Sequence, residues 1–370
     1  MMILASLAMS ALLGKPDISQ IVHKEFHRSL DDGNTIGLSV GICLHGHTYQ
    51  YNFGTLILNK KTSATGRTPY PIASITKTFT GLLLAQAVLE KKVKLDDDVR
   101  KYLPGDYANL QFDREPIRLW ELLNHTSALP QNLPLSFEPD RDSTADYAAG
   151  ARREQSLFDG YCRQDFFADL KKVTLDRKPG TKFSYSNAGA QLMGLILEKV
   201  YGKSYLVLVK DRITEPLGMT RTGVLQRDSA LVPRAHCRTE DFLPAIPREL
   251  AAAGSLQASC QDMLRYLKWN LAESSAAVRL AHRKAGTTQW SANDTFYVGL
   301  NWQVFSNKGQ RFIFQDGNLP GFSSYIAFCP EERLGIVLLS NRRMSKDHPH
   351  LSVFAARVLQ AIDSRLVVYE

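Results

Sequence analysis

The sequence has little cysteine, and none of it has a metal-binding or redox spacing. Its five cysteines are Cys43, Cys162, Cys237, Cys260 and Cys329. None forms a Cys-x-x-Cys pair, which excludes the common zinc and thioredoxin-type sites. A Cys237–Cys260 bridge remains open for an exported protein. The nine histidines give only local pairs, such as His23/His27 and His45/His47, and without acidic or cysteine partners nearby we interpret these pairs as surface residues rather than ligands. We expect no metal and no organic cofactor.

Long apolar runs and basic clusters are also missing. The uncharged stretch 1–14 is shorter than the roughly 18 residues that a membrane-spanning helix needs, so no transmembrane span is predicted. Its length suits a signal peptide, although no basic residue precedes it, and the alternative is an apolar helix docked on the body. We expect export, to the periplasm or the medium. The net charge of +8 favours anionic surfaces such as cell-wall polymer, but no Lys/Arg cluster is interleaved with the aromatics typical of nucleic-acid binding.

Strand patterns occupy both ends of the chain, and helical patterns fill the middle. Helices are predicted over 17–31, 74–92, 117–125, 187–202, 260–272 and 350–363. Strands are predicted over 35–44, 48–58, 296–305, 310–315, 322–330 and 334–341. This order predicts an α/β protein of the α+β type, with one antiparallel sheet built from both terminal segments. A single catalytic domain, 15–370, would combine an α/β lobe (15–94 and 295–370) with an inserted, mainly helical lobe (95–294).

Two serines compete as the nucleophile. Ser39 lies in "GLSVG", which matches the Gly-x-Ser-x-Gly elbow, but that motif needs a helix directly after the serine. Here the apolar alternation continues through Ile42 and Leu44 into a turn, so Ser39 is predicted to be a strand residue.

Ser74 is the stronger candidate because Lys77 follows it three positions later in "PIASITKTFTG". Residues three apart share one face of a helix, within reach of a long lysine side chain. A serine hydroxyl needs a base, and an apolar environment favours the neutral lysine that could act as one. The alternative is an N-cap serine beside a surface lysine, and Ser-x-x-Lys alone is a weak motif.

A second motif supports Ser74. Tyr185 and Asn187 follow a Pro-Gly turn and precede a helix in "KPGTKFSYSNAGAQLMG". A phenol near an ammonium could relay protons, and the asparagine amide could orient Lys77 and a substrate carbonyl. The similar Tyr107–Asn109 triplet lacks these flanks, and we interpret it as loop.

Together these motifs resemble the penicillin-recognising serine hydrolases, over about residues 20–365. That superfamily includes class C β-lactamases, D-alanyl-D-alanine carboxypeptidases and endopeptidases, and esterases. Further segments that resemble it are "LWELLNHTSALP", "ITEPLGM" and "AAAGSLQAS". The resemblance implies a β-lactamase/transpeptidase-like fold and a Ser74 acyl-enzyme, with acid–base work shared by Lys77 and Tyr185 and with Asn187 holding the geometry. His125 is interpreted as structural rather than catalytic.

The third motif of that superfamily is altered here. Alignment places Gln315, Asp316 and Gly317 where the superfamily has a cation, a small or hydroxyl residue and a glycine, and the N–H of Asn318 would complete the oxyanion hole. The missing cation ordinarily helps to bind the carboxylate of penicillins and D-Ala-D-Ala peptides, and Asp316 would repel an anion. Losing a charge-assisted hydrogen bond costs roughly 1.5–3 kcal/mol, or about ten- to a hundredfold in affinity.

The sequence therefore predicts weak β-lactam turnover and a preference for amides or esters. The leading hypothesis is a hydrolase of cell-wall D-alanyl peptides, with possible peptidoglycan association. A class C-type β-lactamase and a carboxylesterase remain alternatives, as does a β-lactam sensor or scaffold that binds without hydrolysis. Arg342 and Arg343, just after the last strand, are candidates to restore positive charge.

Overall fold

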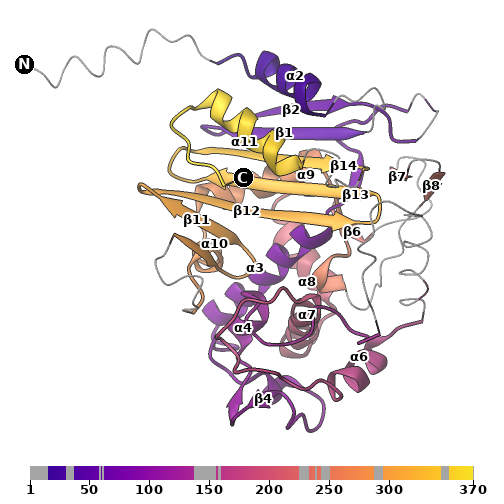
Figure 1. Ribbon diagram of the computed structural model, residues 1–370, viewed down its shortest axis with the longest axis vertical. Helices are drawn as coiled ribbons and strands as arrows, with labels where there is room; N and C mark the ends of the chain where they lie inside the picture. Colours follow the sequence, from indigo (N-terminus) through magenta and orange to yellow (C-terminus); the bar gives the residue numbers. More distant parts are fainter. Residues whose placement is uncertain are drawn as a thin grey trace, which may run out of the picture.

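The centre of the fold is a seven-stranded antiparallel sheet in the order β10-β11-β12-β13-β14-β1-β2 (Figure 1). The computed structural model describes residues 16–30, 37–57, 60, 62–136, 156, 160–224, 233–237, 240–242, 251–286, 295–342 and 350–369. The strands are β1 (Leu38–Leu44), β2 (His47–Phe53), β10 (Phe296–Val298), β11 (Gln303–Asn307), β12 (Gln310–Leu319), β13 (Phe322–Cys329) and β14 (Leu334–Ser340). The predicted sheet, built from both terminal segments, is confirmed.

The two halves of the sheet meet where β1 pairs with β14. The N–H of Gly37 donates to Oδ1 of Asn341 at 2.8 Å, across 304 residues of sequence. Ser39 lies within β1, where its buried hydroxyl donates to Oδ1 of Asn52 at 2.8 Å. The strand interpretation of "GLSVG" is therefore confirmed, because no helix follows this serine.

Two amphipathic helices, α2 (Ile18–Ser29) and α11 (Leu351–Ile362), cover one face of the sheet (Figure 1). Helix α2 begins at Asp17, whose carboxylate accepts the N–H of Gln20 at 3.0 Å. Its apolar stripe includes Phe26, whose ring stacks on Phe53 of β2 at a centroid distance of 4.0 Å. Phe354 of α11 is fully buried in the same layer.

Helix α9 (Cys260–Ala272) packs on the opposite face of the sheet. Two strand glycines leave room for it. A Cβ on Gly41 would lie 2.8 Å from Cγ of Leu264, and one on Gly335 would lie 2.8 Å from Cδ1 of Leu267. Helix α9 falls inside the residue range 95–294 that was predicted to form the helical lobe, yet in space it belongs to the sheet.

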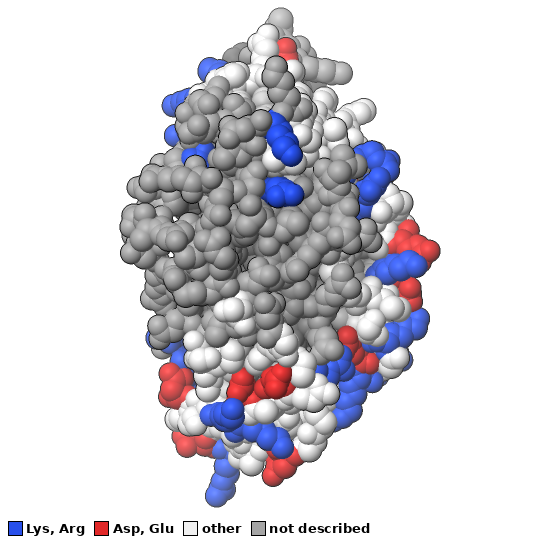
Figure 2. Space-filling view, turned by 90° about the vertical axis from the view of Figure 1, so that its right-hand side faces the viewer, with Lys and Arg blue, Asp and Glu red and all other residues white. Residues whose placement is uncertain are grey.

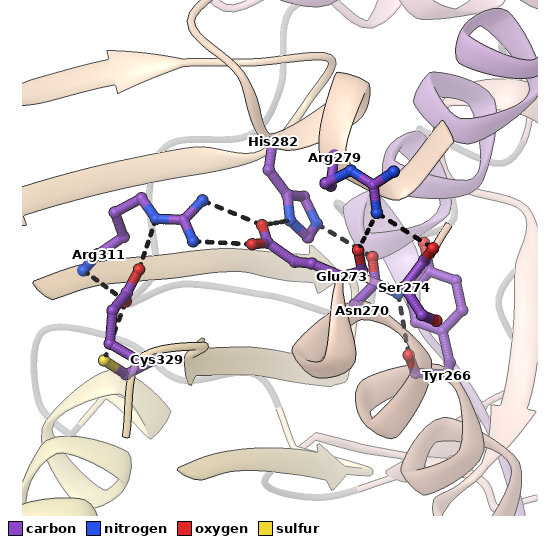
Figure 3. A network of polar contacts seen from close by, with 9 residues as sticks. Tyr266, Asn270, Glu273, Ser274, Arg279, His282, Arg311 and Cys329 are labelled. Carbon is purple, nitrogen blue, oxygen red and sulfur yellow. Dashed lines mark hydrogen bonds and ion pairs between the residues drawn. The ribbon is translucent and has the colours of Figure 1, made fainter. Parts of the chain in front are cut away.

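A polar network fastens α9 and the next helix, α10 (Ala276–His282), to β12 and β13 (Figure 3). Arg311 of β12 donates to both oxygens of Glu273, at 3.0 and 2.8 Å, and to Glu331 at 2.8 Å. His282 lies 2.7 Å from Glu273 through Nδ1 and 3.1 Å from Oδ1 of Asn270 through Nε2. Burial opposes ionisation of Glu273, but hydrogen bonds from His282 and Arg311 outweigh it and lower its pKa to about 2. The network thus anchors the helices that pack beside α3 (Thr76–Leu89).

The helical lobe lies below the sheet, with α3 running between the two (Figure 1). Its helices are α4 (Leu119–Leu123), α6 (Arg163–Leu170), α7 (Asn187–Tyr201) and α8 (Tyr205–Val209). Three small sheets complete the fold. One has three strands, β3 (Pro69–Pro71), β9 (Leu256–Ser259) and β6 (Gly223–Val224). The other two each pair two strands: β4 (Gln111–Phe112) with β5 (Glu115–Pro116), and β7 (Ala235–Cys237) with β8 (Glu240–Phe242). At the lower end of the face in Figure 2, acidic and basic side chains are intermixed.

Two expectations about particular residues need correction. The segment 296–305 is not one strand but two, because Asn301 adopts a left-handed conformation (φ 63°) at a turn between β10 and β11. Cys260 is a free, buried thiol, so the Cys237–Cys260 bridge is not formed. The segment 1–14 and Arg343 lie outside the described residues. Among the helices that are described, none combines the length and the apolar character needed to cross a bilayer.

Candidate active site

Ser74 lies on a short 3₁₀ turn, Ala73–Ile75, that leads directly into α3. The residue before it, Ala73, has a φ of 45°, a left-handed conformation that non-glycine residues rarely adopt. Such strain costs about 1–3 kcal/mol and persists only where the surrounding structure imposes it, most often at functional sites. The helix was predicted to begin at Ser74, and the structure refines this to a strained 3₁₀ turn before α3.

Lys77, in the first turn of α3, points its ammonium group at Ser74. Its Nζ lies 2.9 Å from Oγ of Ser74 and 2.6 Å from the carbonyl oxygen of Ala253, and the side chain is fully buried. Burial lowers the pKa of Lys77 to about 7, against a smaller opposing effect of the Asp316 carboxylate. A large neutral fraction therefore exists near neutral pH, which is what a serine-activating base requires.

Tyr185 approaches Ser74 from the other lobe. Its hydroxyl donates to Oγ of Ser74 at 2.6 Å, and its ring centroid lies 5.0 Å from Nζ of Lys77. Burial raises the pKa of Tyr185 well above its ordinary value, so the phenol keeps its proton at neutral pH. The three side chains of Ser74, Lys77 and Tyr185 are thus joined by hydrogen bonds, with Lys77 the group able to accept a proton.

Asn187 is placed differently from the expectation. It is the first residue of α7, after the N-cap Ser186, and its side-chain amide donates to Oδ1 of Asn132 at 2.7 Å. Within the described part of the chain it makes no hydrogen bond to Lys77, whose second partner is instead the Ala253 carbonyl. That carbonyl could not be identified from sequence, because any residue can supply a backbone oxygen.

Gly317 allows β12 to lie directly against the turn that carries Ser74. A Cβ at this position would lie 2.6 Å from the carbonyl oxygen of Ile72, 2.9 Å from the backbone nitrogen of Ser74 and 2.5 Å from Oγ of Ser324. Only glycine fits such a contact, because two of these three atoms belong to the backbone. The strand predicted to carry the third motif is therefore adjacent to Ser74, and Asn318 follows directly.

The side chains of Gln315 and Asp316 leave opposite faces of β12, because strand residues alternate. Gln315, on the Gly317 side, is buried and accepts a hydrogen bond from Nε2 of Gln303 at 2.9 Å. Asp316 pairs with Tyr325 on the face that α11 covers, and Nδ2 of Asn318 donates to it at 3.2 Å. Asp316 is itself an exposed residue of β12, although the protein packed around its carboxyl group raises the pKa of that group. Asp316 was expected to face a bound anion. Because its side chain leaves the other face of β12, it can affect the site through the electrostatic effect of its charge, as on Lys77, but not by touching a bound substrate.

We expect Gly317→Ala to disturb the turn that carries Ser74. The added methyl group must displace backbone, which typically costs about 1–3 kcal/mol of stability, and a shift of about 1 Å at the nucleophile can cost about 100-fold in rate. Acylation rate and melting temperature measure the two effects. Gly223→Ala is the matched control, because a Cβ there meets nothing within 4 Å. Equal acylation rates for the two variants would contradict the packing argument.

With this geometry established, comparison with known proteins places the chain. A family model described as Beta-lactamase matches residues 22–360. The chain belongs to the beta-lactamase family. Members of the family are serine hydrolases, so the predicted resemblance and enzyme class are confirmed.

Individual members of the family are distant relatives. The chain is 27% identical over 335 residues to Protein flp of Staphylococcus aureus strain N315, covering 88% of this chain and 63% of that protein. It thus spans less than two thirds of the length of that relative. It is 24% identical to a beta-lactamase of Pseudomonas fluorescens, covering 94% of this chain and 99% of that protein.

Solved structures of the family share the fold. A beta-lactamase/D-alanine carboxypeptidase from Yersinia pestis, complexed with citrate, superposes with a TM-score of 0.74 at 24% identity, over 93% of this chain and 97% of that one. A class C beta-lactamase superposes with a TM-score of 0.76 at 21% identity, over 97% and 99%. The predicted β-lactamase/transpeptidase-like fold is confirmed by this likeness.

Several other candidate residues lie outside the Ser74 site or support it indirectly. Asn109 donates to the carbonyl oxygens of Leu170 and Val173, both at 2.9 Å, which is a structural role for the Tyr107–Asn109 loop. Asn301, which was not predicted to contribute to the site, donates to the carbonyl oxygen of Lys77 at 3.0 Å and so holds the first turn of α3.

Within the described residues, no group of three His, Cys, Asp or Glu side chains could hold a metal ion.

Proposed function

We propose that this chain is a serine acyl hydrolase that forms an acyl-enzyme at Ser74 and acts on D-alanyl peptides of the cell wall. The observation that carries the proposal is the hydrogen-bonded set of Ser74, Lys77 and Tyr185, with both partners within 2.9 Å of Oγ. Export from the cytoplasm is part of the proposal, because the substrate lies outside it.

The roles follow from which groups hold protons. Oγ of Ser74 attacks the substrate carbonyl and gives its proton to the neutral Nζ of Lys77. The N–H groups of Ser74 and Asn318 are proposed to stabilise the oxyanion. The leaving amine or alkoxide takes a proton from the Tyr185 hydroxyl, which is restored from Lys77. Water then attacks the acyl carbonyl and gives a proton to Lys77 or Tyr185. The same group passes a proton to Oγ of Ser74 as the bond between Oγ and the acyl carbon breaks. Asn187 and Asn132 are proposed to border the acyl group.

The altered third motif supports a substrate without a strict need for a carboxylate. Gln315 offers a neutral amide where a cation is usual, so penicillins and D-Ala-D-Ala peptides, which both carry a carboxylate, are proposed to bind more weakly than they would beside a cation, and penicillins are proposed to be poor substrates. A class C-type β-lactamase and a carboxylesterase are the alternatives with the same chemistry. A sensor or scaffold that stays acylated is the alternative from another class.

Intact-protein mass spectra over time, after adding benzylpenicillin, a D-Ala-D-Ala peptide or a chromogenic ester, separate these functions. Release of D-alanine with a weak, slowly formed penicillin adduct is the expected result. Rapid, transient penicillin adducts with accumulating hydrolysed drug would identify a β-lactamase. Turnover of the ester alone would identify an esterase, and a permanent adduct without any product would identify a sensor.

We expect Gln315→Lys to improve turnover of carboxylate-bearing β-lactams. Restoring a charge-assisted hydrogen bond of roughly 1.5–3 kcal/mol should lower their KM by about ten- to a hundredfold. A neutral ester should show little change, and Gln315→Met serves as the control for size without charge. An equal gain for the ester, or the same gain with methionine, would show that the charge at this position does not select the substrate.

A further inference from the structure

His125 holds the segment that carries Tyr185, and it does so through its backbone and its side chain together. Its carbonyl oxygen accepts the N–H of Ser184 at 2.7 Å, and its Nδ1 accepts the N–H of Ser186 at 3.2 Å. These two bonds bracket Tyr185 on both sides. The rings of His125 and Tyr185 also lie 4.4 Å apart, at an interplanar angle of 40°.

This contact matters because Tyr185 has no secondary structure of its own to fix it. Residues 182–186 belong to no helix or strand, and α7 begins only at Asn187. The neighbouring Phe183 also packs edge-on against the His125 ring, with centroids 5.7 Å apart. His125 therefore touches four consecutive residues, from Phe183 to Ser186.

The backbone of His125 also adopts a strained conformation. Its φ of 63° is left-handed, a conformation in which histidine, asparagine and aspartate are the more tolerated non-glycine residues. The residue is buried, and burial together with the charge of Lys77 lowers the pKa of the imidazole to about 3. The ring is therefore neutral at working pH, which lets Nδ1 remain an acceptor facing the Ser186 N–H.

We propose that His125 is a positioning residue for the Ser74 reaction, which sets the distance between the Tyr185 hydroxyl and Oγ of Ser74. It acts through Tyr185 and transfers no proton itself. This inference rests on the proposed function and adds a residue that the sequence indicated only as structural. A displacement of about 1 Å at such a group costs about 100-fold in rate, so the expected effect lies in acylation rather than in substrate binding.

The test compares His125→Ala with His125→Asn in the full-length protein. Asparagine tolerates the left-handed conformation and carries an acceptor near the place of Nδ1, whereas alanine removes the acceptor and the ring. With a chromogenic ester as substrate and a fluorophosphonate to titrate reactive Ser74, we expect His125→Ala to lower kcat per titrated site by about 10- to 100-fold. KM should change far less, and asparagine should restore kcat to within about threefold.

Thr126→Val is the matched control for disturbance of the same loop, because among the described residues the Thr126 hydroxyl bonds only locally, to Oδ1 of Asn124 at 2.6 Å. It should lower the melting temperature without changing kcat per site. A merely structural role would make His125→Ala behave like this control, and that result overturns the proposal. If His125→Ala does not fold, the test rests on His125→Asn. A pH profile and kcat that match those of the wild type support the proposal. A loss of activity in His125→Asn with an unchanged melting temperature overturns the proposal.

Failure of this inference is distinguishable from failure of the proposed function. If the wild-type protein neither reacts with the fluorophosphonate nor turns over the ester, Ser74 is not an activated nucleophile and the proposed function is wrong. If the wild type is active and His125→Ala is equally active per site, only the positioning role is wrong.

Discussion

Replacing Ser74 with alanine should abolish acyl transfer. The substitution removes only Oγ, the atom that both Lys77 and Tyr185 contact, so the fold should survive. Loss of a nucleophile that acts together with its base typically costs on the order of 10⁵- to 10⁶-fold in kcat. Stopped-flow or endpoint hydrolysis of a chromogenic ester measures the loss, and mass spectrometry should find no acyl adduct.

Ser39→Ala is the matched control for this experiment. Ser39 belongs to the competing "GLSVG" motif but is buried in β1, where it bonds Asn52. Its loss should cost about 1 kcal/mol of stability and leave ester turnover near the wild-type rate. Activity that survived in Ser74→Ala but disappeared in Ser39→Ala would overturn the assignment of the nucleophile.

Lys77→Ala should slow acylation by several orders of magnitude. A positioned general base contributes about 10²- to 10⁴-fold, and here the same group also holds Ser74 at 2.9 Å. Because Lys77 is fully buried, alanine also leaves a cavity. Lys77→Met separates the two effects, since it fills the space without a base and should show the same loss. Near-normal rates in the methionine variant would remove Lys77 from the mechanism.

The pH dependence of the wild type should report on Lys77. The reactive form is neutral, so kcat/KM should rise about tenfold per pH unit at low pH and level off above the pKa of about 7. The Asp316 carboxylate favours the charged form of Lys77 and raises its pKa. Asp316→Asn should therefore move the acidic limb to lower pH. A limb that stays in place would show that another group titrates there.

The motifs around Ser74, Lys77 and Tyr185 could be recognised from sequence because their chemistry depends on local spacing. Ser74 and Lys77 are three residues apart, and Tyr185 follows a Pro-Gly turn at the start of a helix. The sheet could be predicted for a similar reason, since apolar alternation within each strand is a local signal. The prediction of a single strand over 296–305 was wrong because a turn at Asn301 interrupts the strand, although the apolar pattern of the sequence continues through it.

Features that depend on contacts between distant residues could not be predicted. Nothing in the sequence near Ala253 indicates that its carbonyl accepts a hydrogen bond from Lys77, 176 positions away. The same holds for His125, whose partners at 184 and 186 are brought to it by the folding of the helical lobe. The direction of Asp316 required the strand register, because a shift by one residue exchanges the two faces.

The pairing of β1 with β14 affects how this protein folds while the ribosome synthesises it. The partners Gly37 and Asn341 are 304 residues apart, so at about 5–20 residues per second the N-terminal hairpin waits roughly 15 to 60 s for its neighbour. Throughout that interval β1 carries an open edge, which is a template for pairing with other chains. Nascent chains of this fold therefore pass through a stage in which chaperone binding or aggregation competes with completion of the sheet.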